Sequence, residues 1–153
     1  MDRRTFIKSS LAGGALWGVP TLLRPHPKMF RTALIGAGWW GMNIARMALQ
    51  SGEIELVALC DVDRNILENA AKEVEALTGK KPLQFKDYRD LLQKVRPDIA
   101  IVATPDHWHA LPTIEAIEAG ADVYVEKPIG HTILEGRAMV NSARKYGRIV
   151  QVG

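Results

Sequence analysis

Residues 36–41 form a glycine-containing segment whose spacing suits the binding of a diphosphate. Glycines occupy its first, third and sixth positions, after an apolar run and before a segment of helical character. A strand, turn and helix in this order present backbone amides to phosphate groups at the start of the helix. We expect Gly36 to make the tight turn, Gly38 to let phosphates approach, and Gly41 to let helix and strand pack closely. The alternative is an ordinary strand–helix turn.

Asp61 lies 20 residues after Gly41, at the end of the next apolar run. A carboxylate at this place can accept hydrogen bonds from both hydroxyls of an adenosine ribose, and it repels a 2′-phosphate. This favours NAD over NADP, although Arg64 weakens the preference because an arginine can accommodate the phosphate. Asp63 is interpreted as a helix N-cap, and a plain turn residue is the alternative for Asp61.

A second polar group, residues 104–109, follows a later apolar run. Thr104 and Pro105 could border a dinucleotide, and the ring of Trp108 could stack on one. His107 and His109 are spaced as a pair of metal ligands, but no third ligand is evident, so no metal is predicted. Taken alone, His109 fits a packed or surface histidine better than a catalytic one.

Lys127 stands between Glu126 and Pro128, directly after another short apolar run. A lysine at the carboxyl end of a buried strand can have its pKa lowered by desolvation. It can then exchange protons near neutral pH or hydrogen-bond a substrate hydroxyl. A solvated lysine beside a glutamate is the alternative, and the position after a strand leaves both interpretations open.

The elements that must position these residues alternate between apolar strands and amphipathic helices. Strands are predicted at 31–35, 54–60, 83–85, 99–103, 123–125 and 149–152, and helices at 42–50, 65–78, 88–95, 109–119 and from a capping box at 132 to about 146. This alternation predicts an α/β fold, a doubly wound parallel sheet of Rossmann type with helices on both faces. Ligands bind such sheets at the carboxyl ends of the strands, where the candidate residues stand.

The charge of the 153-residue chain is concentrated near its N-terminus. The formal net charge is +3, but residues 1–28 carry +4 and residues 29–153 carry −1. The body of the chain therefore gives no basis for a nucleic-acid partner. The single cysteine, Cys60, excludes an internal disulfide and a multi-cysteine metal site. Because Cys60 closes an apolar run, we expect its side chain to be buried.

Residues 1–28 are predicted to be a twin-arginine export signal followed by a linker. Arg3 and Arg4 precede an apolar residue and Lys8, and a mild apolar run follows that is short and rich in glycine for a membrane span. Asp2 stands where serine or threonine is usual, and no clear cleavage site follows. We expect a periplasmic or exported protein, anchored in the membrane if the leader is retained. The alternatives are an accidental basic N-terminus and a short membrane anchor.

Taken together, residues 36–41, 104–109 and 126–128 resemble the motifs of the Gfo/Idh/MocA family, named for glucose–fructose oxidoreductase, inositol dehydrogenase and a rhizopine-catabolism protein. The resemblance covers about residues 30–153. It implies an NAD(P)-binding Rossmann domain over residues 29–153, with NAD as cofactor and NADP as the less favoured one. It also implies that Lys127 is the catalytic residue beside the nicotinamide and a sugar hydroxyl, and that the peptide bond before Pro128 is cis.

The resemblance further assigns the remaining site residues. The expected cofactor-binding residues are Gly36, Gly38, Trp39, Trp40, Gly41, Asp61, Thr104, Pro105, His109, Glu126, Lys127 and Pro128. His109 matches the histidine of the Thr-Pro-x-x-x-His pattern of the family. Relatives continue into a second α/β domain that supplies most of the substrate pocket, and this domain is expected to be missing here. Full-length relatives are expected to form homo-oligomers.

Three functions are compatible with these features. The first is the NAD-binding domain of an exported oxidoreductase that acts on the CH–OH group of a small-molecule sugar, with the twin-arginine translocation machinery as a further partner. The second, from the same family, is an NAD-dependent glycoside hydrolase or lyase that oxidises C3 of the sugar transiently. The third is an inactive cofactor-binding fragment or scaffold, because half of the active site would be absent.

Overall fold

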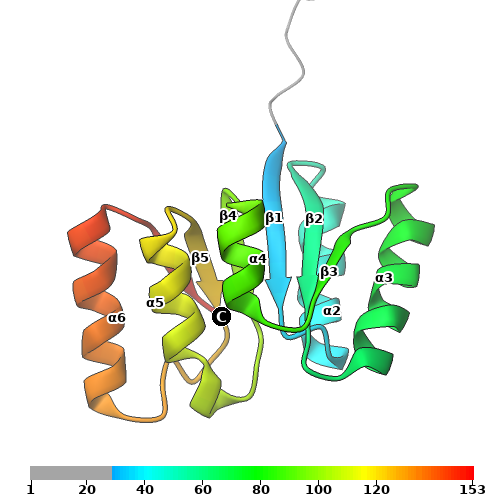
Figure 1. Ribbon diagram of the computed structural model, residues 1–153. Coiled ribbons are helices and arrows are strands. Elements are labelled where there is room, and N and C mark those ends of the chain that lie inside the picture. The colour runs from blue at the N-terminus through cyan, green and yellow to red at the C-terminus, as the bar shows by residue number, and fades with distance from the viewer. Residues whose placement is uncertain (1–28) are drawn as a thin grey trace, which may run out of the picture.

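A parallel sheet in the strand order β3–β2–β1–β4–β5–β6 organises residues 29–153, the part of the chain that the computed structural model describes (Figure 1). The strands are β1 (Phe30–Ile35), β2 (Ile54–Cys60), β3 (Leu83–Phe85), β4 (Ile99–Val102), β5 (Asp122–Val125) and β6 (Val150–Val152). The α-helices are α2 (Trp39–Gln50), α3 (Arg64–Thr78), α4 (Tyr88–Val95), α5 (Ala110–Glu118) and α6 (Ile133–Tyr146), and a short 3-10 helix, η2, covers Asp106–Trp108. The predicted doubly wound fold is confirmed.

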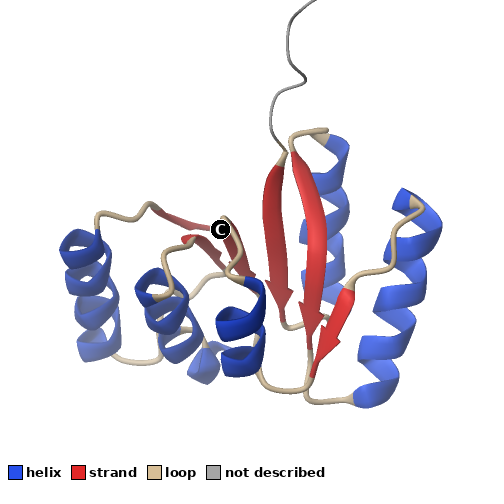
Figure 2. Cartoon of the chain, turned by 45° about the horizontal axis from the view of Figure 1, so that its top comes forward, coloured by secondary structure: helices blue, strands red, loops and turns tan. Residues whose placement is uncertain are grey.

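The centre of the sheet is buried on both faces, which explains why β4 is apolar throughout and why β1 is apolar from Ala33 to Ile35. In β1, Ala33 and Ile35 pack into a core formed with α4, α5 and α6. Leu34, between them, belongs to the opposite core, formed with α2 and α3. Figure 2 shows these helices on either side of the strands. The strand order reverses between β1 and β4, and this is the point at which open α/β sheets bind ligands.

Side chains cap the N-termini of α3 and α6, as the sequence predicts. The Asp63 carboxylate accepts hydrogen bonds from the amides of Asn65 and Ile66 and so caps α3, which confirms its interpretation as an N-cap. At α6, Thr132 accepts from the Glu135 amide, while the Glu135 carboxylate accepts from the Thr132 amide. This reciprocal pair is the predicted capping box.

Some predicted boundaries were wrong by one to three residues. Helix α2 begins at Trp39 and not at residue 42, because Gly38 takes the N-cap position and its carbonyl accepts from the Met42 amide at 2.9 Å. Likewise, β4 ends at Val102, and His109 is the N-cap of α5 and not its first residue. The early start of α2 matters for the site, since it brings the first helical amides into the glycine turn.

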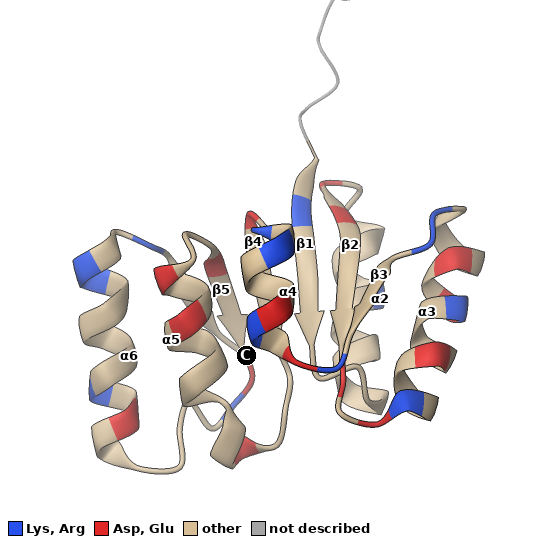
Figure 3. Cartoon of the chain, viewed as in Figure 1, with Lys and Arg blue, Asp and Glu red and all other residues tan. Residues whose placement is uncertain are grey.

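The predicted leader and linker, residues 1–28, lie outside the described residues. Among the helices of residues 29–153, none is long and apolar enough to cross a membrane. Acidic and basic side chains are interspersed over this part of the chain, and α3, α4 and α6 each carry both signs (Figure 3). The exposed surfaces of these three helices are therefore mixed in charge.

Candidate functional site

The three glycines of the turn after β1 have different surroundings. Gly36 has φ +92°, and a Cβ on it would lie 2.6 Å from the carbonyl carbon and oxygen of Ala103 and 2.8 Å from the Thr104 amide nitrogen. A Cβ on Gly41 would overlap the carbonyl oxygen of Gly36. Gly38 is different, because a Cβ there would meet no atom within 4 Å. Gly36 and Gly41 are thus required by the fold, whereas Gly38 leaves an open space above the turn.

Backbone amides at the start of α2 face this open space without partners. No side chain caps the helix, and among residues 29–153 no acceptor takes the amides of Gly38, Trp39 or Trp40. Unpaired amides and the positive end of the helix dipole favour an anion at this place. The geometry therefore supports the predicted diphosphate seat.

The Asp61 carboxylate, at the end of β2, braces the glycine turn. Oδ2 accepts a hydrogen bond from the Ala37 amide at 2.9 Å, and Oδ1 accepts one from the Asp63 amide at 3.0 Å. Each oxygen keeps a further lone pair, and the side chain is partly exposed. The guanidinium of Arg64 is paired with Glu68 on its own helix at 2.7 Å. Asp61 therefore remains able to accept hydroxyl hydrogens beside the turn.

Two hollows adjoin the carboxyl edge of the sheet, and they meet at Thr104 and Pro105. The first, of about 350 Å³, is mainly apolar, and its lining includes Gly36, Asp61, Val62, Trp108 and Pro112. The second, of about 650 Å³, is lined by Gly38, Trp39, Trp40, Gly41, Ala103, Asp106, His109, Glu126 and Lys127, together with the two shared residues. Lys127 and the amides of the turn thus border the same hollow, as the prediction requires.

His109 is buried, and its ring contacts both the loop after β4 and the loop after β5. Its side chain is 2% exposed. Nδ1 lies 2.6 Å from the carbonyl oxygen of Pro128, and Nε2 lies 2.7 Å from the carbonyl oxygen of Thr104. Both ring nitrogens are therefore occupied by the protein's own backbone, although the ring borders the second hollow.

Glu126 is a buried carboxylate that lines the second hollow next to Lys127. It is 6% exposed, and it accepts hydrogen bonds from the Tyr124 hydroxyl at 3.2 Å and from the Lys127 amide at 3.3 Å. Burial, and then the Glu126 carboxylate, raise the pKa of the Tyr124 hydroxyl above its ordinary value. The side chain of Lys127 is exposed, and its peptide bond to Pro128 is cis, as expected.

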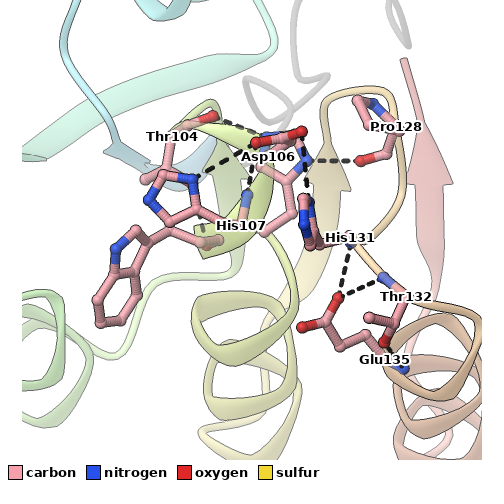
Figure 4. A network of polar contacts seen from close by, with 9 residues as sticks. Thr104, Asp106, His107, Pro128, His131, Thr132 and Glu135 are labelled. Carbon is pink, nitrogen blue, oxygen red and sulfur yellow. Dashed lines mark hydrogen bonds and ion pairs between the residues drawn. The ribbon is translucent and has the colours of Figure 1, made fainter.

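Sequence reasoning missed a polar network that joins the loops after β4 and β5. Figure 4 shows the Asp106 carboxylate between the rings of His107 and His131, at 3.5 Å and 3.7 Å. The backbone amide of His107 is the main cause that lowers the pKa of Asp106. Glu135 accepts from the His131 amide as well as from its capping-box partner. No group of three metal-ligating side chains occurs in residues 29–153.

Cys60 is buried, as predicted. Its side chain is 4% exposed, and burial, together with the nearby carboxylates of Asp61 and Asp87, raises the pKa of the thiol to about 12. The thiolate is the reactive form of cysteine, so this group is not poised as a nucleophile near neutral pH. Cys60 therefore contributes packing to the wall beneath the first hollow.

The strand order, and the glycine turn with unpaired amides after β1, are typical of a dinucleotide-binding Rossmann domain. Residues 30–153 match the family model GFO_IDH_MocA, described as an oxidoreductase family with an NAD-binding Rossmann fold. The chain belongs to this family.

Curated relatives and solved structures agree with this assignment. A glycosyl hydrolase family 109 protein of Shewanella baltica is 31% identical over 128 residues, which are 81% of this chain and 28% of the relative. The myo-inositol 2-dehydrogenase of Lactobacillus plantarum superposes with a TM-score of 0.74 at 30% identity, over 82% of this chain and 36% of that one. The WlbA dehydrogenase of Bordetella pertussis, solved with NADH and UDP-GlcNAcA, has a TM-score of 0.69 at 30% identity, over 82% and 37%.

This chain therefore spans about a third of the length of the proteins that it matches. What the whole protein acts on is accordingly a matter of proposal.

Proposed function

We propose that residues 29–153 bind NAD across the carboxyl edge of the sheet. The observation that carries this proposal is the arrangement of two hollows on either side of a turn with unpaired amides. Gly38 leaves room above those amides that a side chain would fill. The residues present thus fit a dinucleotide, whose two halves need separate pockets and whose diphosphate needs hydrogen-bond donors.

Each part of the cofactor has its own candidate residues. The apolar first hollow would take the adenosine, with its ribose hydroxyls at Asp61. The amides of Gly38, Trp39 and Trp40 would hold the diphosphate. The second hollow, which contains Lys127, would take the nicotinamide.

NAD is the proposed cofactor rather than NADP. A 2′-phosphate would meet the Asp61 carboxylate, whose charge repels it. Arg64, the residue that could offset this repulsion, is engaged by Glu68 on its own helix. The pair is solvent-exposed and so contributes little stability, but it directs the guanidinium along α3.

When bound, the nicotinamide would supply a hydride acceptor or donor at its ring. Lys127 would hydrogen-bond a substrate hydroxyl and move its proton at Nζ. The buried Glu126 carboxylate accepts from the Lys127 amide, and so orients the backbone that carries Nζ. These residues suit oxidation or reduction at a CH–OH carbon.

The proposed substrate is a sugar or sugar derivative, with the complete protein acting as an NAD-dependent oxidoreductase. Support comes from the two solved relatives at 30% identity, which are named as an inositol dehydrogenase and as a dehydrogenase complexed with a nucleotide sugar. The second candidate is glycosidic cleavage, favoured by the curated relatives named for glycosyl hydrolase family 109. Net NADH formation with a glycoside substrate would support the first, and cleavage without net NADH would support the second.

Titration of the 153-residue chain with NADH tests the cofactor assignment. Trp39 and Trp40 border one hollow and Trp108 the other, so bound NADH should quench tryptophan emission and gain emission by energy transfer. We expect saturable quenching that NAD competes away. Absence of saturable binding to the folded chain would overturn the proposal and leave only the inactive-scaffold alternative.

Asp61→Ala tests the ribose role. A hydrogen bond to a charged group contributes about 1.5–3 kcal/mol, so we expect NADH affinity to fall about 10- to 150-fold and the preference for NADH over NADPH to shrink. Asp63→Ala is the matched control, because it removes the cap of α3, at about 1 kcal/mol of stability, without touching the hollow. Equal NADH affinity in both variants, or an unchanged cofactor preference in Asp61→Ala, would show that Asp61 serves only the turn.

We also propose export of the complete protein by the twin-arginine pathway. Support comes from Arg3, Arg4 and the mild apolar run after Lys8. Replacing both arginines by lysine keeps the charge but removes the paired motif, and we expect the variant to accumulate in the cytoplasm. Cell fractionation measures this, and unchanged periplasmic recovery of the double variant would contradict it.

A further inference from the structure

We infer that His109 is a positioning residue that, as an imidazolium, donates to two backbone carbonyls and holds the Lys127–Pro128 segment against the loop after β4. The carbonyl oxygens of Thr104 and Pro128 lie 2.7 Å and 2.6 Å from its two ring nitrogens. The inference rests on the proposed function only for the role of Lys127, since the contacts exist in the protein alone.

The chemistry of the two partners carries the inference. A carbonyl oxygen can only accept, and a neutral imidazole has one N–H and one bare nitrogen. In the neutral ring, a lone pair would face one of the two oxygens at hydrogen-bond distance, with no proton between them. An imidazolium donates from both nitrogens, and charge-assisted bonds are characteristically short. The two short contacts are thus satisfied together only by the protonated ring.

The surroundings of His109 contain groups that oppose and support a buried positive charge. The ring is 2% exposed, so an unpaired charge there would be costly. The same hollow is lined by the carboxylates of Asp106 and Glu126 and by the ammonium of Lys127. The ring of His131 lies on the far side of Asp106, at 3.7 Å. Two carbonyl oxygens therefore contact the ring directly, and two carboxylates, one ammonium and one further imidazole lie around the same hollow.

The two hydrogen bonds of His109 also affect the second hollow. Pro128 directly follows Lys127, and Thr104 stands where the two hollows meet, so His109 ties together both walls of the second hollow. A neutral ring would donate to only one of the two carbonyls, and the loops would then be held at one end only.

Nitrogen NMR of the His109 ring in the cofactor-free 153-residue chain tests the protonation state directly. We expect both ring nitrogens to show the protonated type of signal at neutral pH. One protonated and one bare nitrogen would overturn the inference. This readout needs neither cofactor nor substrate, so it decides the inference even if NADH fails to bind and the proposed function falls.

The His109→Gln variant tests positioning. An amide side chain donates from one end only, so we expect NADH affinity to fall about tenfold or more. His131→Gln is the control, because it removes an exposed histidine of the same loop pair, and its NADH affinity should match the parent. Parent-like NADH affinity in His109→Gln would overturn the inference. If His109→Gln does not fold, the ring NMR of the parent chain still decides.

Discussion

Substituting Gly36 by alanine is expected to lower the free energy of unfolding by about 2–5 kcal/mol. Alanine at φ +92° carries backbone strain of about 1–2 kcal/mol. Its Cβ would also press on the Ala103 carbonyl and the Thr104 amide at 2.6–2.8 Å, and overpacking of this kind costs about 1–3 kcal/mol. All three neighbouring atoms belong to the backbone just after β4, so they cannot move aside like a flexible side chain. Urea unfolding of the parent and the variant measures the difference.

Gly120→Ala is the matched control for Gly36→Ala. Gly120 has nearly the same backbone angle, φ +96°, but a Cβ there would meet no atom within 4 Å. We expect this variant to lose only the strain, about 1–2 kcal/mol. Equal destabilisation by both substitutions would mean that the ends of β1 and β4 do not approach as closely as described.

The second large effect is expected at Gly38, on binding and not on folding. Gly38 has φ −65° and ψ −178°, angles that alanine adopts readily, and no atom lies near its missing Cβ. Stability should therefore change by less than about 1 kcal/mol. A methyl group in the space meant for the phosphates should cost about 1–3 kcal/mol of binding, which is about 5- to 150-fold in NADH affinity.

Gly136→Ala controls for the exchange of a glycine by alanine elsewhere. Gly136 lies inside α6, where a Cβ meets only the Ile129 side chain at 3.9 Å. Alanine there should stabilise the helix by about 0.5–1 kcal/mol and leave NADH affinity unchanged. If Gly38→Ala bound NADH as tightly as this control, the open space above the turn would not be the phosphate seat.

Most of the fold could be predicted from the sequence because its signals are local. Apolar runs covered on both faces identified the strands, and Asp63 and Thr132 identified helix starts by their capping side chains. The start of α2 was predicted three residues late, since Gly38 caps it without a side chain and leaves no capping signal. Helix ends at Gly79 and Gly147 were marked by the left-handed conformation that glycine tolerates.

The candidate site could be predicted only in outline. The order of motifs after successive strands placed Lys127 and the glycine turn at one edge, and the structure puts them around one hollow. The contacts of His109, and the hydrogen bond from the Ala37 amide to Asp61, join residues far apart in the chain. Such contacts depend on how the loops pack, so local spacing carries no sign of them. Tyr124 was also missed, although its partner is only two residues away, because its type and position do not show that its hydroxyl donates to the buried Glu126.

The central claim is that one dinucleotide spans the turn after β1 and reaches Lys127 after β5. Amide NMR of the isotope-labelled chain, titrated with NADH, tests it most directly because every backbone amide reports separately. We predict saturable shifts concentrated at Gly38, Trp39, Trp40 and Lys127, with little change at loops of the opposite edge such as Gly52 and Gly79. Shifts gathered at that opposite edge, or none at saturating NADH, would contradict the claim.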